Sequence, residues 1–182
     1  DYLTHLAVCH TIITEEKDGV VEYKASSPDE LALVNAARYF GFKFMGRDSD
    51  QNLILNIGET QLLISILNVI EFTSDRKRMS VVIRLPNGRY KILCKGADTI
   101  LLPRLKPSDT VDVTYRHLED FASEGLRTLV LTQRELSESE YIRWNEQYLD
   151  AARDILNKEK RIASVAELIE QDLELVGATA IE

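Results

Sequence analysis

A run of short strand-like segments between residues 42 and 94 constrains the fold more than any other feature of this sequence. Asn87 and Gly88 form the clearest two-residue hairpin turn in the chain, so the segments on either side of them are expected to pair as antiparallel neighbours. The strands predicted in this run cover residues 42–45, 53–57, 61–65, 68–72, 79–85 and 89–94. Such a cluster predicts a sheet built largely from antiparallel neighbours.

Helical patterns stand on both sides of this run. Ser27 suits a helix N-cap, Pro28 the first helical position and Glu30 the third position of a capping box, and Gly41 suits the residue after the helix. Other segments predict a strand over 20–25, a short helix from residue 98, a helix over 111–124, a strand over 126–133, and one broken or two consecutive helices over 138–170. Clustered strands flanked by helices favour an α+β fold with a mainly antiparallel, twisted sheet.

The charge balance excludes several classes of protein. The 182 residues carry 30 acidic and 22 basic side chains, a net charge of -8, whereas nucleic-acid and anionic-membrane binders need a broad cationic surface. The 45% hydrophobic content suffices for one sizeable core, so a single domain over residues 1–182 is expected. Cys9 and Cys94 give no disulfide framework and are expected to be reduced.

The ends of the chain suggest part of a larger protein. The sequence has no initiator Met and no signal peptide, and it stops as a new apolar run begins. The longest apolar stretch, residues 62–70, is about half of what a membrane-spanning helix requires. We therefore expect an excised piece without a membrane-spanning segment of its own.

Cations and an aromatic residue gather between residues 71 and 98. Arg76 and Arg78 are expected on one face of a strand and Lys77 on the other. Phe72 precedes a turn-prone Thr-Ser-Asp sequence, and a bend there would bring its ring to the side of Lys77. By spacing alone, Phe72 could equally be a core aromatic, and the Arg-Lys-Arg run a solvated edge that discourages sheet-to-sheet aggregation.

Three further residues are candidates for ligand contacts, each with a plain structural alternative. Lys95 stands before Gly96, where a strand ends and a helix begins, but a surface lysine before a turn is the commoner case. Arg127 has the parity of an apolar row in its strand, so it could reach over a pocket rim or extend to solvent. Glu30 is explained by the capping box without any ligand.

Common catalytic and nucleotide-binding motifs are absent. Neither the P-loop pattern nor the dinucleotide-binding glycine pattern occurs, and no hydrolase elbow or triad order is found. His5, Cys9 and His10 suit one helical turn, but no second cluster completes a tetrahedral site, so no metal ligands are expected.

Taken in order, however, several segments resemble one family. They are LAVCHT (6–11), YKASSPDELALVNAA (23–37), LNVIEFTSDRKRMSVVIRLPNGRY (67–90), LCKGADTI (93–100), HLEDFASEGLRTLVL (117–131) and LELVGATAIE (173–182). Together they are similar to the nucleotide-binding domain of P-type ATPases, in particular of the type IV subfamily, the phospholipid flippases. The resemblance covers essentially the whole chain.

The resemblance implies an ATP site made of named residues. The residues that it assigns to ATP binding are Glu30, Phe72, Ser74, Lys77, Lys95 and Arg127. In this family the aromatic matching Phe72 stacks on adenine, the glutamate matching Glu30 reaches the purine edge, and the matching lysines line the pocket. The matching arginine lies near the ribose and phosphates, while Ser74 and Thr73 are weaker candidates at the rim. The basic hairpin would then be a local ATP trap in an acidic protein.

The same resemblance implies a larger pump around this piece. A complete member carries a phosphorylation loop, metal-binding aspartates, an actuator domain and membrane helices, none of which occurs in these 182 residues. The piece is therefore expected to bind ATP, accompanied by Mg²⁺, without hydrolysing it and without catalytic residues of its own. Its implied partners are the phosphorylation and actuator domains, a phospholipid substrate and an accessory membrane subunit, and its implied location is the cytosolic side of a membrane protein.

Two alternatives remain open on the sequence. One is a non-catalytic interaction module, in which the Arg-Lys-Arg edge and the charged C-terminal helices bind a protein partner or an autoinhibitory tail. The other is the equivalent domain of a P-type pump that moves cations, since the membrane part that would distinguish the two pumps is absent here.

Overall fold

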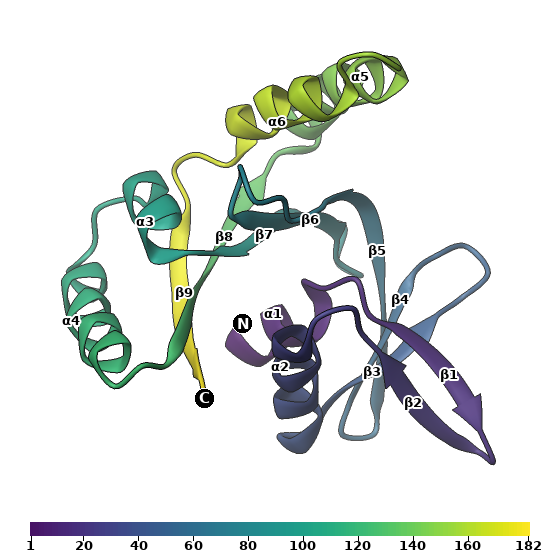
Figure 1. The fold of residues 1–182 in the computed structure, drawn as a ribbon. Helices are drawn as coiled ribbons and strands as arrows, with labels where there is room; N and C mark the ends of the chain where they lie inside the picture. The colour runs from purple at the N-terminus through teal and green to yellow at the C-terminus, as the bar shows by residue number, and fades with distance from the viewer.

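A seven-stranded antiparallel sheet forms the centre of the structure, a computed structural model that describes residues 1–182 (Figure 1). The strands pair in chain order without a crossover, so each one is antiparallel to the next. They are β3 (Phe42–Arg47), β4 (Leu53–Ile57), β5 (Thr60–Ile70), β6 (Arg78–Arg84), β7 (Tyr90–Gly96), β8 (Arg127–Leu136) and β9 (Glu174–Ile181). The expected α+β fold with an antiparallel, twisted sheet and flanking helices is confirmed.

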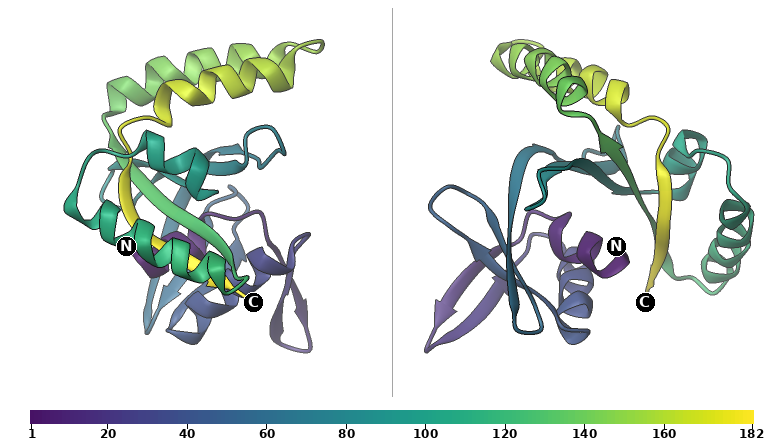
Figure 2. Two further views of the ribbon diagram at one scale, coloured as in Figure 1. Left: turned by 60° about the vertical axis from the view of Figure 1, so that its left-hand side comes forward. Right: turned by 180° about the vertical axis from the view of Figure 1, so that it is seen from behind.

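Helices cover both faces of this sheet, which curls strongly (Figures 1 and 2). The remaining elements are α1 (Tyr2–Val8), β1 (Ile13–Lys17), β2 (Val20–Lys24), α2 (Pro28–Tyr39), α3 (Asp98–Leu101), the 3-10 helix η1 (Leu102–Arg104), α4 (Asp109–Ser123), α5 (Glu138–Arg153) and α6 (Lys158–Ile169). Helices α1 and α2 lie inside the curl, whereas α3, α4 and the α5–α6 hairpin lie outside it. The β1–β2 hairpin is a separate two-stranded sheet.

The curled sheet separates two apolar cores. Because side chains alternate along a strand, Met79 and Val81 of β6 join the inner core with α1 and α2, whereas Val82 joins the outer core with α3 to α6. Arg78 and Ser80 share the outer parity and are also buried. Strand β6 is therefore buried on both faces over residues 78–83, the polar Arg78 and Ser80 included.

Local signals position α2 and the β6–β7 hairpin as the sequence predicts. The Ser27 hydroxyl accepts a hydrogen bond from the backbone N–H of Glu30 at 3.5 Å, and Pro28 opens α2. Gly41 follows the helix with φ +88° and Gly88 forms the hairpin turn with φ +83°. Both glycines adopt the left-handed conformation that other residues avoid.

The expected break between two strands at residues 65–68 is wrong, because β5 runs without interruption from Thr60 to Ile70. A register shift against β6 between Ile66 and Asn68 absorbs the irregularity. Asn68 is buried, and its amide oxygen accepts from the Tyr141 hydroxyl at 2.7 Å, so this polar residue does not end the strand. Strand β5 stops at Ile70, which leaves Phe72 in the following loop.

Cys9 and Cys94 are both free and buried, and burial raises the pKa of the Cys9 thiol to about 11.

No group of three or more His, Cys, Asp and Glu residues is arranged to hold a metal ion. No helix has both the length and the hydropathy that a bilayer span demands.

Candidate functional site

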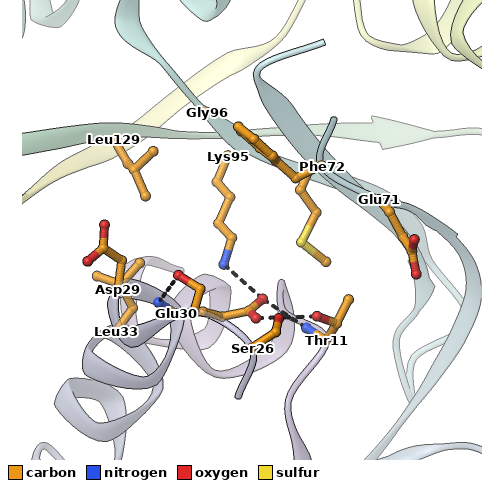
Figure 3. Close-up of a pocket in the computed structure, with 12 residues that line it drawn as sticks. Thr11, Ser26, Asp29, Glu30, Leu33, Glu71, Phe72, Lys95, Gly96 and Leu129 are labelled. Atoms are coloured by element: carbon orange, nitrogen blue, oxygen red, sulfur yellow. Dashed lines mark hydrogen bonds and ion pairs between the residues drawn. The ribbon is translucent and has the colours of Figure 1, made fainter. Parts of the chain in front are cut away.

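A cavity of about 490 Å³ opens where α2, the end of β5 and strands β6 to β8 meet (Figure 3). It lies on the inner side of the sheet, because Leu33 and Met79 in its wall belong to the inner core. The residues that line it are Thr11, Ser26, Ser27, Asp29, Glu30, Leu33, Glu71, Phe72, Met79, Lys95, Gly96 and Leu129. Its volume falls within the usual range for small-molecule sites.

Lys95 and Glu30 face each other across this cavity (Figure 3). The Lys95 ammonium lies 3.7 Å from Glu30 Oε1, and the two side chains are only 11% and 10% exposed. Thr11 donates to the same carboxylate through its backbone N–H at 2.9 Å and its hydroxyl at 3.3 Å. The carboxylate of Glu30 is thus turned towards the cavity, and only the backbone N–H of this residue takes part in the helix cap.

Phe72 lies near Gly96 and the backbone end of Lys95 in the view of Figure 3, and Glu30 lies on the other side of the cavity. The side chain of Phe72 is 59% exposed, so the core-aromatic alternative is wrong. The expected bend follows it directly: the Lys77 N–H donates to the Thr73 carbonyl at 2.8 Å and the Arg76 N–H donates to the Thr73 hydroxyl at 3.1 Å. An exposed aromatic face beside a buried lysine suits a flat ligand that also carries negative charge.

Arg127 reaches the edge of the cavity through a carboxylate partner. Its Nη2 lies 2.5 Å from Oδ1 of Asp29, which lines the cavity. The Arg127 side chain is 63% exposed at the start of β8, so it extends to solvent while it adjoins the cavity through Asp29. An anionic ligand at this edge would compete with Asp29 for the guanidinium.

The structure therefore gathers some of the expected site residues and separates others. Glu30, Phe72 and Lys95 line one cavity, and Arg127 adjoins it. Ser74 and Lys77 are exposed in the loop before β6 and do not line the cavity.

The interpretation of the whole Arg-Lys-Arg run as a trap for ATP needs correction. Arg76 and Arg78 are only 6% and 3% exposed and pair with the fully buried Glu170. For the same reason the run is not a solvated sheet edge, and these two arginines are unavailable to the protein partner of the interaction-module alternative. Of the lysines in this segment, Lys95 lines the cavity and Lys77 is exposed beside it.

Sequence reasoning missed Thr11 and Asp29 as parts of the site. Thr11 follows α1, a short helix that the periodicity of the sequence does not predict. Its contact with Glu30 joins residues 19 positions apart, so no local pattern indicates it. Asp29 precedes Glu30 in the first turn of α2. Its position next to this candidate residue is the one feature of the sequence that could have indicated a place in the site. Its ion pair spans 98 positions and depends on how β8 packs against α2.

The cavity offers binding groups, but no histidine lines it to act as a general base. Three carboxylates line it: Glu30 and Asp29 are each paired with a cation, whereas Glu71 is exposed and forms no ion pair. Burial and the nearby Lys95 charge lower the pKa of His5 to about 4, so this histidine is neutral at pH 7. Its Nε2 lies 3.0 Å from the buried Thr132 carbonyl oxygen. The arrangement suits recognition of a ligand rather than acid–base chemistry.

Gly96 allows the cavity wall to pack tightly, and its replacement gives a first prediction. A Cβ at residue 96 would lie 2.6 Å from the Lys77 carbonyl oxygen and 2.7 Å from Arg78 Cβ. Gly96→Ala is therefore expected to lower the free energy of unfolding by about 2 kcal/mol, as overpacking typically does. Urea unfolding measures it, and amide NMR shifts should change at Lys77 and Arg78.

Gly58→Ala is the matched control for this substitution. Gly58 has φ +60° and no atom within 4 Å of the point where a Cβ would stand, so only backbone strain of about 1 kcal/mol is expected there. Unchanged stability of Gly96→Ala, together with unchanged shifts at Lys77, would contradict the close approach of these backbones.

Comparison with known proteins places the fold in the class of P-type ATPase cytoplasmic domains. The family profile described as P-type ATPase, cytoplasmic domain N, matches residues 1–182, so the chain belongs to this family. It is 48% identical to phospholipid-transporting ATPase DRS2 of Saccharomyces cerevisiae over 100% of this chain. It is 46% identical to phospholipid-transporting ATPase dnf2 of Schizosaccharomyces pombe, also over 100% of the chain. Identity to phospholipid-transporting ATPase IC of Homo sapiens is likewise 46%, over 97% of the chain.

The chain spans only a small part of these relatives. It covers 14% of the first, 13% of the second and 14% of the third. The family expected from the ordered motifs is confirmed over the full 182 residues, and these three relatives are named for phospholipid transport. Their names describe proteins about seven times as long as this chain.

Proposed function

We propose that this chain binds ATP in the cavity between Phe72, Lys95 and Glu30, and that it serves as the nucleotide-binding part of an ATP-driven phospholipid-translocating pump. The observation that carries the proposal is the exposed Phe72 ring at a cavity that also holds the largely buried Lys95–Glu30 pair. Membership of the P-type ATPase domain N family and the phospholipid-transporting relatives support it.

The three groups would divide the recognition of the nucleoside. The Phe72 ring supplies a stacking surface for adenine. The Glu30 carboxylate, already fixed by Thr11, has lone pairs left to accept hydrogen bonds from the purine edge. Lys95 supplies a positive charge deep in the cavity and balances the negative charge of Glu30 beside it.

The phosphates would extend towards the rim, where Arg127 and the loop with Ser74 and Lys77 lie. The guanidinium of Arg127 can bind an oxyanion through several N–H groups, whereas a lysine acts as a point charge. Mg²⁺ would arrive with the nucleotide, because Glu30 and Asp29 are engaged by cations and the carboxylates of the cavity form no ligand set of their own. The γ-phosphate would be presented to an aspartate elsewhere in the same pump.

The same proposal sets the location and the partners. The domain would stand on the cytosolic side of the membrane and contact the phosphorylation and actuator domains of its pump. The phospholipid and an accessory membrane subunit would bind the membrane part. With contacts from one domain only, the affinity for ATP is expected to be on the order of millimolar, or about 4 kcal/mol.

A two-dimensional amide NMR titration of this chain with ATP, ADP and GTP tests the proposal. Saturable shifts at Glu30, Phe72, Lys95 and Arg127 are expected with ATP and ADP, and weaker shifts with GTP, whose purine edge presents different groups. Shifts that are absent or scattered over the surface would contradict it. Salt-dependent binding of peptides without any nucleotide effect would select an interaction module instead.

A second prediction concerns the carboxylate that occupies Arg127. Asp29→Asn is expected to raise the affinity for ATP about two- to fivefold, because a partly exposed ion pair worth up to about 1 kcal/mol no longer competes with phosphate. Titration with ATP and adenosine measures the effect, and adenosine affinity should stay unchanged. A fall in ATP affinity would show that Asp29 itself contributes to ligand binding.

A further inference from the structure

A buried ion cluster lies behind the proposed ATP site, on the outer face of the sheet. Its centre is Glu170, the residue after α6, which has no exposed surface. Its carboxylate accepts from Arg76 Nη1 at 2.7 Å and Nη2 at 3.1 Å, from Arg78 Nε at 2.9 Å and from the Ser80 hydroxyl at 2.8 Å. One carboxylate thus holds both arginines that flank Lys77.

Glu170 is held in place by contacts that do not involve this loop. Its backbone N–H donates to the Ala166 carbonyl at 3.0 Å and so closes the last turn of α6. The carbonyl of the preceding Ile169 accepts from Arg134 Nη2 of β8 at 2.9 Å. Arg134 in turn donates to Glu140 of α5 at 2.8 Å. The carboxylate is therefore a fixed point against which the loop is anchored.

Arg78 also forms an ion pair with a second acidic residue, Glu167 of α6. Its Nη2 lies 2.7 Å from Glu167 Oε1, which is also 2.7 Å from Arg104 Nη2. Burial alone would lower the pKa of Arg78, but Glu170 and Glu167 raise it above its ordinary value. The arginine is thus firmly charged and directed away from the cavity side of the sheet.

Lys77 lies between the two anchored arginines but, unlike them, is exposed. It has no carboxylate within ion-pair distance, whereas Lys95 and Arg127 each have one. Its φ of +53° is a conformation that lysine rarely adopts and that persists where the surroundings impose it. Its carbonyl oxygen accepts from the Ala97 N–H at 3.2 Å, beside Gly96 of the cavity wall.

We propose that Glu170 is a positioning residue: by holding Arg76 and Arg78 on the outer face, it fixes the loop between β5 and β6 so that Lys77 stands unpaired beside the cavity for the phosphates of ATP. This inference rests on the proposed function. It assigns the two flanking arginines to the support of the site and the lysine between them to ligand contact. Because the anchor acts on Lys77, its loss weakens phosphate binding more than nucleoside binding.

The test compares the dissociation constants of ATP and adenosine, measured by amide NMR titration. Glu170→Gln keeps the shape of the side chain and removes its charge, and it is expected to weaken ATP binding about threefold or more while adenosine changes less than about twofold. Tyr141→Phe is the matched control: it removes a buried hydrogen bond to Asn68 under α5 and touches neither arginine. Both affinities should stay unchanged in this control.

A double substitution separates positioning from general loosening of the fold. Lys77→Gln alone is expected to weaken ATP binding about tenfold, as the loss of one charged phosphate contact does. If Glu170 acts through Lys77, adding Glu170→Gln to Lys77→Gln causes no further loss. Should Glu170→Gln show the poorly dispersed spectrum of an unfolded chain, Arg76→Gln replaces it, because this variant leaves the Arg78–Glu170 contact intact.

Each outcome distinguishes this inference from the proposed function. Equal losses for ATP and adenosine, a further loss in the double variant, or unchanged binding in both Glu170→Gln and Arg76→Gln would overturn the positioning role while ATP binding stands. A wild-type chain without saturable ATP shifts would overturn the proposed function itself, and the inference with it.

Discussion

Glu170→Gln is expected to lower the free energy of unfolding by about 3 to 5 kcal/mol, the usual cost of removing one partner from a buried ion pair. The carboxylate has no exposed surface, and the guanidiniums of Arg76 and Arg78 are nearly as buried. Without the negative charge, Arg76 loses its carboxylate partner and Arg78 keeps only Glu167, while the amide of Gln offers N–H groups where the arginines need an acceptor. Urea unfolding followed by circular dichroism measures the loss.

The exposed pair Lys24–Glu15 provides the comparison. Its side chains are 54% and 44% exposed, so Glu15→Gln is expected to change the unfolding free energy by no more than about 0.5 kcal/mol. Domains of this kind are typically stable by about 5 to 15 kcal/mol, so Glu170→Gln stays folded without denaturant unless the wild type is at the low end. Equal effects of the two substitutions would show that the Glu170 cluster is hydrated in solution.

The parts of the fold that the sequence predicts are those decided by neighbouring residues. Ser27 and Pro28 start α2, and Asn87-Gly88 turns β6 into β7, because capping and turn geometry depend on a few adjacent residues. The two strands expected over 61–65 and 68–72 leave out residues 66 and 67, which β5 includes at its register shift against β6. The partner of Asn68 in this strand, Tyr141, is 73 positions away, so no local pattern indicates it.

The candidate site divides in the same way. The spacing of residues identifies Phe72 and Lys95 as ambiguous candidates, and only the resemblance to P-type ATPases gives them roles. The partners of the arginines depend on tertiary structure: Arg76 and Glu170 are 94 positions apart. No local pattern distinguishes an arginine that binds a ligand from one that supports the loop beside it.

Phe72→Ala is expected to weaken ATP binding about ten- to hundredfold, because stacking of a base on an aromatic ring is worth about 1 to 3 kcal/mol. Stability should change little, since the side chain is 59% exposed and lies in a loop rather than in either core. Amide titration with ATP gives the affinity, and thermal unfolding of the same sample gives the stability. The expected result is a loss of binding in a folded protein.

Alanine substitutions of two other phenylalanines are the controls for this experiment. Phe40 is 64% exposed and does not line the cavity, so Phe40→Ala should leave both affinity and stability nearly unchanged. Phe44 has no exposed surface and belongs to the inner core, so Phe44→Ala should cost about 3 to 5 kcal/mol of stability. If Phe72→Ala behaves like Phe44→Ala, the ring is a packing residue in solution. If it behaves like Phe40→Ala, ATP does not stack on it. A selective loss of ATP affinity is the one outcome that places Phe72 in the binding site.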